Sequence, residues 1–210
     1  MQRRLILLRH GETDYNATSR MQGQLDTTLS ERGVNQAHAA AEELRDLGIS
    51  KIISSDLVRA KDTADVVAAD LGLAVDVDKR LRETHLGDWQ GKTHTEVDTE
   101  HEGARAVWRT DATWAPPRGE SRLEVAVRAQ AVVDELMRDY DEWDNSAVLL
   151  VSHGGTIAAL TASLLGFVVA QYPAIKGLGN ANTARLVAMP RLDEPAQTRW
   201  FLEAWNRGLN

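Results

Sequence analysis

The sequence predicts an α/β fold, a three-layer sandwich in which helices cover both faces of a mostly parallel central sheet. Two segments, 3–9 (RRLILLR) and 147–152 (AVLLVS), are apolar through their centres, which is typical of strands buried on both faces. Segments in which apolar residues recur at helical spacing alternate with these and with shorter strands. This alternation favours a parallel sheet covered by helices, because each parallel connection has to cross over the sheet.

The first helix is expected between Ser30 and Gly48, directly after a polar loop that follows the strand at 3–9. Ser30 can cap the start of this helix, and Gly48 can end it in a left-handed turn. The residues expected on its buried face are Val34, Ala37, Ala41, Leu44 and Leu47.

A short strand at 51–54 (KIIS) and a second helix ending at Gly72 are expected next. Ser54, Ser55 and Asp56 are the candidate N-caps of that helix. Its buried face is expected to contain Ala60, Ala64, Val67 and Leu71, and a short strand at 74–77 (AVDV) follows. From about 84 to 119 the pattern weakens into a long excursion with tryptophans and prolines, which we expect to cover the site like a lid.

Regular structure resumes at Ser121, where SRLE can form a capping box between Ser121 and Glu124. The helix that follows buries a stripe formed by Leu123, Ala126, Val133, Leu136 and Met137. After the strand at 147–152, an apolar helix covers 154–166, and 183–189 and 199–205 are expected to pair as late strands near a sheet edge. We expect a single domain, 1–210, with no repeats.

Composition limits the possible functions. The net charge of −7 disfavours broad binding to nucleic acids or to anionic membranes, although a local cationic pocket remains compatible with it. The absence of cysteine excludes disulfides, thiolate catalysis and zinc-cysteine sites. The apolar run after MQRR is too short for a signal peptide, and no segment approaches the length of a membrane span, so we expect a soluble cytoplasmic protein.

Both fully apolar strands end in a histidine followed by glycine. The first ends in LLRHGE and the second in LLVSHGG, so His10 and His153 occupy equivalent positions. Ligands of open α/β sheets bind beyond the carboxyl ends of the strands, and neighbouring strands would bring the two imidazoles together there. One such histidine alone is more often structural, but two in the same context, with Arg9 beside one of them, indicate a functional site for an anion.

Five linked segments carry a resemblance to a known family. These are LLRHGETDYN, SSDLVRAKDTA, ETHLGDWQG, GES and VSHGGTIAAL. In order and spacing they resemble the histidine phosphatase superfamily, which has the phosphoglycerate-mutase-like fold. Within it, RMQGQLDTTLSERG, LRETHLGDWQGKTH, DATWAPPRGES and GLGNAN resemble the glucosyl-3-phosphoglycerate phosphatases of methylglucose lipopolysaccharide biosynthesis. The resemblance implies a phosphomonoester hydrolase that needs no metal or other cofactor, acts on a small molecule and forms a homodimer.

The resemblance also implies the roles of individual residues. His10 would attack phosphorus and form a phosphohistidine, since a neutral imidazole is not repelled by a phosphate dianion. Arg9, Arg59 and His153 would contact the phosphoryl oxygens, and Glu83 would act as general acid and then general base. The candidate substrate contacts are Asn16, Gln22, Gly23, His85, Trp114, Arg118 and Gly154.

Several alternatives remain open from the sequence. Glu12 and Glu120 are rival proton donors, and His10, His153 and Glu83 could instead bind zinc, although two nearby arginines disfavour a dication. The chain could also be a phosphoglycerate mutase, a fructose-2,6-bisphosphatase or a ribazole phosphatase. A different class of protein, an inactive sugar-phosphate-binding or interaction module, is a further alternative.

Overall fold

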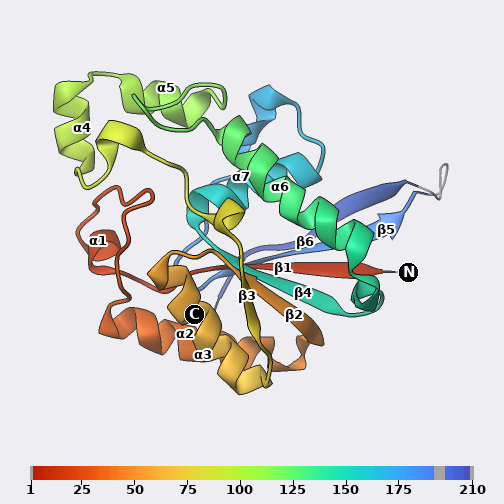
Figure 1. The fold of residues 1–210 in the computed structure, drawn as a ribbon. Coiled ribbons are helices and arrows are strands. Elements are labelled where there is room, and N and C mark those ends of the chain that lie inside the picture. The colour runs from red at the N-terminus through yellow and green to blue at the C-terminus, as the bar shows by residue number, and fades with distance from the viewer. Residues whose placement is uncertain (1, 192–196, 209–210) are drawn as a thin grey trace.

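The computed structural model describes residues 2–191 and 197–208. Within these ranges the chain forms one six-stranded sheet with the order β3-β2-β4-β1-β5-β6 (Figure 1). The strands are β1 (Arg3–Arg9), β2 (Ile49–Ser54), β3 (Val75–Val77), β4 (Ala147–Ser152), β5 (Thr183–Pro190) and β6 (Thr198–Arg207). Strands β1 to β4 pair in parallel, whereas β5 and β6 add antiparallel pairs at one edge. The predicted mostly parallel sheet and the late edge strands are confirmed.

Two helix layers cover the sheet. Helices α2 (Glu31–Leu44) and α3 (Val58–Leu71) cover one face, and α6 (Arg122–Asp139) and α7 (Gly154–Leu164) cover the other (Figure 1). Alternate residues of β1 enter the two apolar layers, because successive side chains of a strand point to opposite faces. Leu5 and Leu7 pack on the side of α6 and α7, and Ile6 and Leu8 pack on the side of α2 and α3.

The short elements complete the chain order. They are α1 (Asp14–Ala17), η1 (Arg45–Leu47), η2 (Lys79–Leu81), η3 (Gly87–Trp89), α4 (His94–Glu100), α5 (Ala104–Thr110), η4 (Asp141–Trp143) and η5 (Val169–Ala174). No helix among the described residues is long and apolar enough to cross a membrane.

Helix ends agree with the sequence in some places and differ in others. Ser30 caps α2 by accepting a hydrogen bond from the amide of Gly33, and the predicted capping box at Ser121 is present at α6. The predicted caps of α3 are wrong, because the N-cap is Leu57, and the amide of Val58 donates instead to Oδ1 of Asp26 at 2.8 Å. Asp56 instead forms an ion pair with Arg82. Within α2, Val34 is exposed rather than buried.

The 84–119 excursion is more ordered than its sequence pattern indicated. It contains η3, α4 and α5 and forms its own apolar cluster around the fully buried Trp89. Trp108 and Trp114 pack against Trp89, with ring centroids 5.9 and 5.4 Å from it. The helices α4 and α5 lie toward the same end of the molecule as α1, the end at which β1 terminates (Figure 1). The excursion therefore stands beside the edge of the sheet where the two histidines emerge.

Candidate active site

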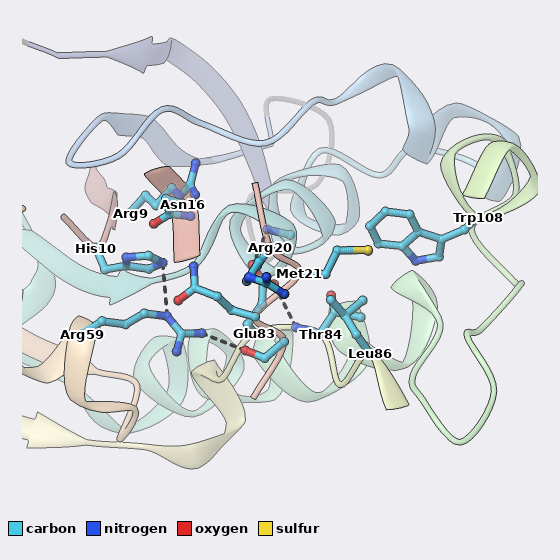
Figure 2. Close-up of a pocket in the computed structure, with 13 residues that line it drawn as sticks. Arg9, His10, Asn16, Arg20, Met21, Arg59, Glu83, Thr84, Leu86 and Trp108 are labelled. Carbon is cyan, nitrogen blue, oxygen red and sulfur yellow. Dashed lines mark hydrogen bonds between the residues drawn. The ribbon is translucent and has the colours of Figure 1, made fainter. Parts of the chain in front are cut away.

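A cavity of about 190 Å³ lies beyond the carboxyl end of β1. Its walls come from the end of β1, the loop after α1, the start of α3, the segment after η2, the excursion and the start of α7 (Figure 2). The lining residues are Arg9, His10, Asn16, Arg20, Met21, Gln22, Gly23, Arg59, Glu83, Thr84, Leu86, Trp108 and Gly155.

His10 is positioned with one ring nitrogen free to act as a nucleophile. Its Nδ1 lies 2.6 Å from the carbonyl oxygen of Gly11, and a carbonyl can only accept, so Nδ1 carries the proton. The other nitrogen, Nε2, accepts a hydrogen bond from Nε of Arg59 at 3.3 Å. Burial lowers the pKa of His10 well below its ordinary value of 6.5, and the charges of Arg9 and Arg59 lower it further. The imidazole is therefore neutral near pH 7, with a lone pair on Nε2.

Arg59 and Arg9 bring positive charge to the same cavity. Arg59 is almost fully buried, and its two terminal nitrogens donate to the carbonyl oxygens of Leu25 and Gly23, each at 2.8 Å. Burial lowers its pKa to about 10, which still leaves it charged near neutral pH. Arg9 donates to the carbonyl oxygen of Leu178, and its Nε is buried with no partner among the described residues. Asp56, close to Arg59 in sequence, pairs with Arg82 instead.

His153 lies beside His10, as the strand ends predicted. β1 and β4 are neighbours, paired as far as Arg9 with Ser152, and the two imidazole centroids are 5.1 Å apart. His153 is fully buried and its Nε2 lies 2.9 Å from Oγ of Ser55. Its Nδ1 has no partner among the described residues, and burial lowers its pKa well below 6.5. His153 thus lies beside His10 and does not line the cavity in this structure.

The carboxylate of Glu83 lies at the N-terminus of α7. Its Oε2 accepts from the amide of Gly155 at 3.0 Å, and its Oε1 accepts from the amides of Thr156 and Thr84 at 3.1 and 2.8 Å. A Cβ at position 155 would lie 2.6 Å from Oε1, so glycine is required for this approach. The helix start therefore orients the protein's own carboxylate toward the cavity.

Sequence reasoning missed the residue that holds the backbone of this carboxylate in place. Arg128 of α6 donates to the carbonyl oxygens of Arg82 and Glu83, at 2.7 and 3.0 Å. It also forms an ion pair with Glu120 at 2.9 Å. An arginine on a helix 45 positions along the chain carries no local signal for such a contact.

Helix α1 and the loop after it contribute polar side chains to the cavity. Gln22 is buried, and its Oε1 accepts from the hydroxyls of Thr13 and Thr27 at 3.0 and 2.6 Å, so its amide nitrogen is the group left to donate. Asn16 accepts from Asn180 through Oδ1, which likewise leaves its amide nitrogen available. Gly23 has a φ of 54°, and a Cβ there would lie 2.4 Å from Oε1 of Gln90.

Three predicted substrate contacts lie elsewhere. His85 and Trp114 line neither this cavity nor a second cavity that adjoins it. The backbone amide of His85 donates to Glu120, and Trp114 packs on Trp89. Arg118 is exposed and paired with Asp88, also outside both cavities. The aromatic residue that does line the cavity is Trp108, from α5.

The rival carboxylates and the zinc alternative find no support in the geometry. Glu12 forms an ion pair with Arg32, Glu120 pairs with Arg128, and neither lines the cavity. Across 2–191 and 197–208, no three histidine, aspartate or glutamate side chains come together as a metal-binding group. Glu83 is thus the carboxylate that the fold places in the cavity with His10. Gly154, the remaining predicted contact, lines the adjacent cavity.

The two buried histidines make stability depend on pH. Both folded-state pKa values lie below the ordinary 6.5, so the unfolded chain binds more protons, and stability falls as pH drops from 6.5 toward the folded-state values. We expect the urea midpoint to be lower at about pH 5.5 than at about pH 7.5, with a smaller difference in His153→Gln. The exposed His38→Gln provides the matched control; a difference as large in His153→Gln as in the unchanged protein would contradict this account.

The fold and this site define a member of the histidine phosphatase superfamily. The family model described as histidine phosphatase superfamily, branch 1, matches residues 5–207, and the chain belongs to that superfamily. It is a phosphatase by its similarity to phosphatases along nearly its whole length.

Individual relatives narrow the comparison. The glucosyl-3-phosphoglycerate phosphatase of Mycobacterium tuberculosis is 54% identical over 97% of this chain and 94% of its own length. The solved structure of a mycobacterial glucosyl-3-phosphoglycerate phosphatase in complex with VO3 is also 54% identical, with a TM-score of 0.92 over 97% of this chain and 99% of that one. A probable phosphoglycerate mutase, GpmB of Erwinia tasmaniensis, is 33% identical over 96% of this chain and 89% of its own.

Proposed function

We propose that this phosphatase hydrolyses glucosyl-3-phosphoglycerate to glucosylglycerate and phosphate through a phosphohistidine on His10. The observation that carries the proposed chemistry is the neutral imidazole of His10. Its unprotonated Nε2 accepts from Arg59, and it shares one cavity with Arg9 and Glu83. The 54% identity to glucosyl-3-phosphoglycerate phosphatase, over 97% of the chain, supports the substrate.

In the first step, Nε2 of His10 attacks phosphorus, an N–P bond forms and the ester P–O bond breaks. Arg59 and Arg9 hold the equatorial oxygens of the phosphoryl group, whose charge they neutralise. The leaving oxygen takes the bonding electrons and a proton from Glu83. Oε2 is the oxygen suited to carry that proton, because it accepts one amide hydrogen bond whereas Oε1 accepts two.

In the second step, Glu83 takes a proton from water as that water attacks phosphorus. The N–P bond breaks, its electrons return to Nε2 of His10, and inorganic phosphate leaves. The buried proton on Nδ1 stays with the carbonyl of Gly11 throughout, so His10 begins each cycle in the same tautomer. His153 packs beside the ring of His10 and helps to hold it in this orientation.

The non-phosphate part of the substrate extends toward the excursion. Trp108 lines both the cavity that contains His10 and the adjacent one, so it offers an aromatic surface on which a glucose ring can pack. Met21 and Leu86 add apolar contacts in the same wall. We therefore propose that the 84–119 excursion covers the substrate, with Trp108 in the place that the sequence assigned to Trp114.

Substrate preference is tested by removing the sugar. We expect kcat/KM for glucosyl-3-phosphoglycerate to exceed that for 3-phosphoglycerate by more than roughly tenfold, because the smaller compound lacks the binding energy of the glucose. Trp108→Ala should reduce this ratio, and Trp200→Ala, on the distant strand β6, should not. Comparable values for the two esters in the unchanged protein would reject the substrate assignment and leave the phosphatase chemistry standing.

A mutase reaction is the second candidate, because a probable phosphoglycerate mutase is also similar to this chain. Incubation with 3-phosphoglycerate distinguishes the two: a phosphatase releases inorganic phosphate, whereas a mutase accumulates 2-phosphoglycerate. An inactive binding module would do neither. The homodimer implied by the resemblance and the cytoplasmic location expected from the sequence stay predictions.

A further inference from the structure

A second cavity, of about 590 Å³, adjoins the one that contains His10. The two share a wall formed by Arg9, Glu83, Thr84, Trp108 and Gly155. A ligand whose phosphate lies against His10 can therefore extend past Glu83 and Trp108 into this second space. The residues that line only the second cavity are Arg109, Arg122, Gly154, Ala158, Pro173, Ile175, Lys176 and Gly177.

Three cations of this second cavity have no anionic partner in the part of the chain that the structure describes. Arg109, Arg122 and Lys176 form no ion pair and no side-chain hydrogen bond with another described residue. Other arginines on the same two helices are paired. On α5, which contains Arg109, Arg105 pairs with Asp98. On α6, which contains Arg122, Arg128 pairs with Glu120. In a chain of net charge −7, three unpaired cations on one cavity indicate a site for an external anion.

Arg122 is the most constrained of the three. Its guanidinium lies 5.5 Å from the ring centroid of Trp108, the tryptophan in the wall shared by the two cavities. It is the first residue of α6, which the capping box at Ser121 holds in place. Burial lowers the pKa of Arg122, so part of its hydration is already removed before a ligand arrives. Arg109 and Lys176 are exposed and flank it from α5 and from the segment after η5.

We infer that this second cavity binds the carboxylate of the substrate, with Arg122 as the main contact and Arg109 and Lys176 as flanking charges. The inference rests on the proposed function, and it deepens it by stating what the enzyme recognises besides phosphate. The preferred substrates are phosphomonoesters with a second anionic group close to the ester. A guanidinium can bind a carboxylate through two parallel hydrogen bonds, which gives such a contact directional specificity. Arg118, one of the substrate contacts expected from the sequence, is paired with Asp88 on the surface.

The test compares 3-phosphoglycerate with glycerol 3-phosphate, which has a neutral hydroxymethyl group in place of the carboxylate. Each compound is measured as a competitive inhibitor of p-nitrophenyl phosphate hydrolysis, so its own turnover does not matter. We expect the unchanged protein to bind 3-phosphoglycerate at least about tenfold more tightly, as a charged hydrogen-bonded pair allows. Arg122→Gln should raise the inhibition constant of 3-phosphoglycerate by roughly 10- to 100-fold and that of glycerol 3-phosphate by less than about threefold.

Arg118→Gln is the matched control, four positions before Arg122 and also an arginine, but outside both cavities. It should leave both inhibition constants unchanged. Lys176→Gln, at an exposed position, supplies a second variant that should selectively weaken 3-phosphoglycerate even if Arg122→Gln folds poorly. Equal affinity of the unchanged protein for the two compounds, or equal losses for both in Arg122→Gln, would overturn the inference.

This comparison is separate from the test of the glucose. The pair 3-phosphoglycerate and glycerol 3-phosphate reports on the carboxylate, and the pair glucosyl-3-phosphoglycerate and 3-phosphoglycerate reports on the sugar. Loss of preference in the first pair alone would reject the proposed carboxylate site. Loss of preference in the second pair alone would reject the glucosyl substrate and leave a phosphatase that recognises a carboxylate.

Discussion

His10→Ala is expected to abolish turnover, with kcat reduced on the order of 10⁴-fold or more, as for other enzymes that lose their nucleophile. Among the residues that the structure describes, His10 is the histidine that lines the cavity, and His153 is fully buried beside it. Rapid quenching of the unchanged protein with labelled substrate under alkaline conditions should trap a phosphoramidate that acid destroys. Peptide mapping should locate the label on His10.

The loss has to be separated from a folding defect, because His10 is itself buried. His10→Asn retains a polar group next to Gly11, and its thermal midpoint can be compared with that of the unchanged protein. His38→Ala, at an exposed position on α2, should keep full activity. Turnover near the original rate in a folded His10→Ala protein would show that the nucleophile is a different residue.

Glu83→Gln is expected to lower kcat for an alkyl phosphate by roughly 10²- to 10⁴-fold, the range for one general acid-base group. The loss should be smaller for p-nitrophenyl phosphate, whose leaving group departs without a proton. The amide oxygen can take the place of Oε1 and accept from Thr156 and Thr84, and the contact of Oε2 with the Gly155 amide is lost. Because Arg9 and Arg59 are unchanged, binding of inorganic phosphate should persist. Parallel kinetics on the two esters give the comparison.

Glu12→Gln is the control for this variant, since Glu12 adjoins the nucleophile region in sequence but pairs with Arg32 and lies outside the cavity. It should leave the ratio of the two rates unchanged. Equal losses on the alkyl and nitrophenyl esters in Glu83→Gln would assign the proton transfer elsewhere. Glu120 would then be tested next, although its pairing with Arg128 argues for a structural role.

Local pattern was sufficient where a residue acts through its own strand or helix. The apolar strands that end at Arg9 and Ser152 predicted that His10 and His153 would meet, since parallel neighbours end at the same edge, and the imidazoles lie 5.1 Å apart. The capping box at Ser121 was predicted for the same reason, because all its atoms belong to four consecutive residues. The family motifs also predicted that Arg59 and Glu83 would join this edge.

Contacts between distant segments could not be predicted in this way. The sequence assigned Trp114 and Arg118 to the substrate because they lie in a polar excursion near GES, yet Trp114 packs in the cluster around Trp89 and Arg118 pairs with Asp88. Trp108, in an ordinary helical segment, lines the cavity instead. Which of several tryptophans faces outward depends on how the excursion packs.

By itself, the sequence determined the layered α/β fold, the histidine pair and the type of chemistry, because hydrophobic periodicity and short motifs are local properties of the chain. Only the tertiary structure decided that the N-terminus of α7 binds Glu83, that Arg128 fixes the backbone of that residue, and that Arg122 remains unpaired beside Trp108. These features depend on which charges reach one another across the fold. A cation is available to a ligand only where packing leaves it without a carboxylate of its own. Whether a carboxylate lies close enough depends on the tertiary structure.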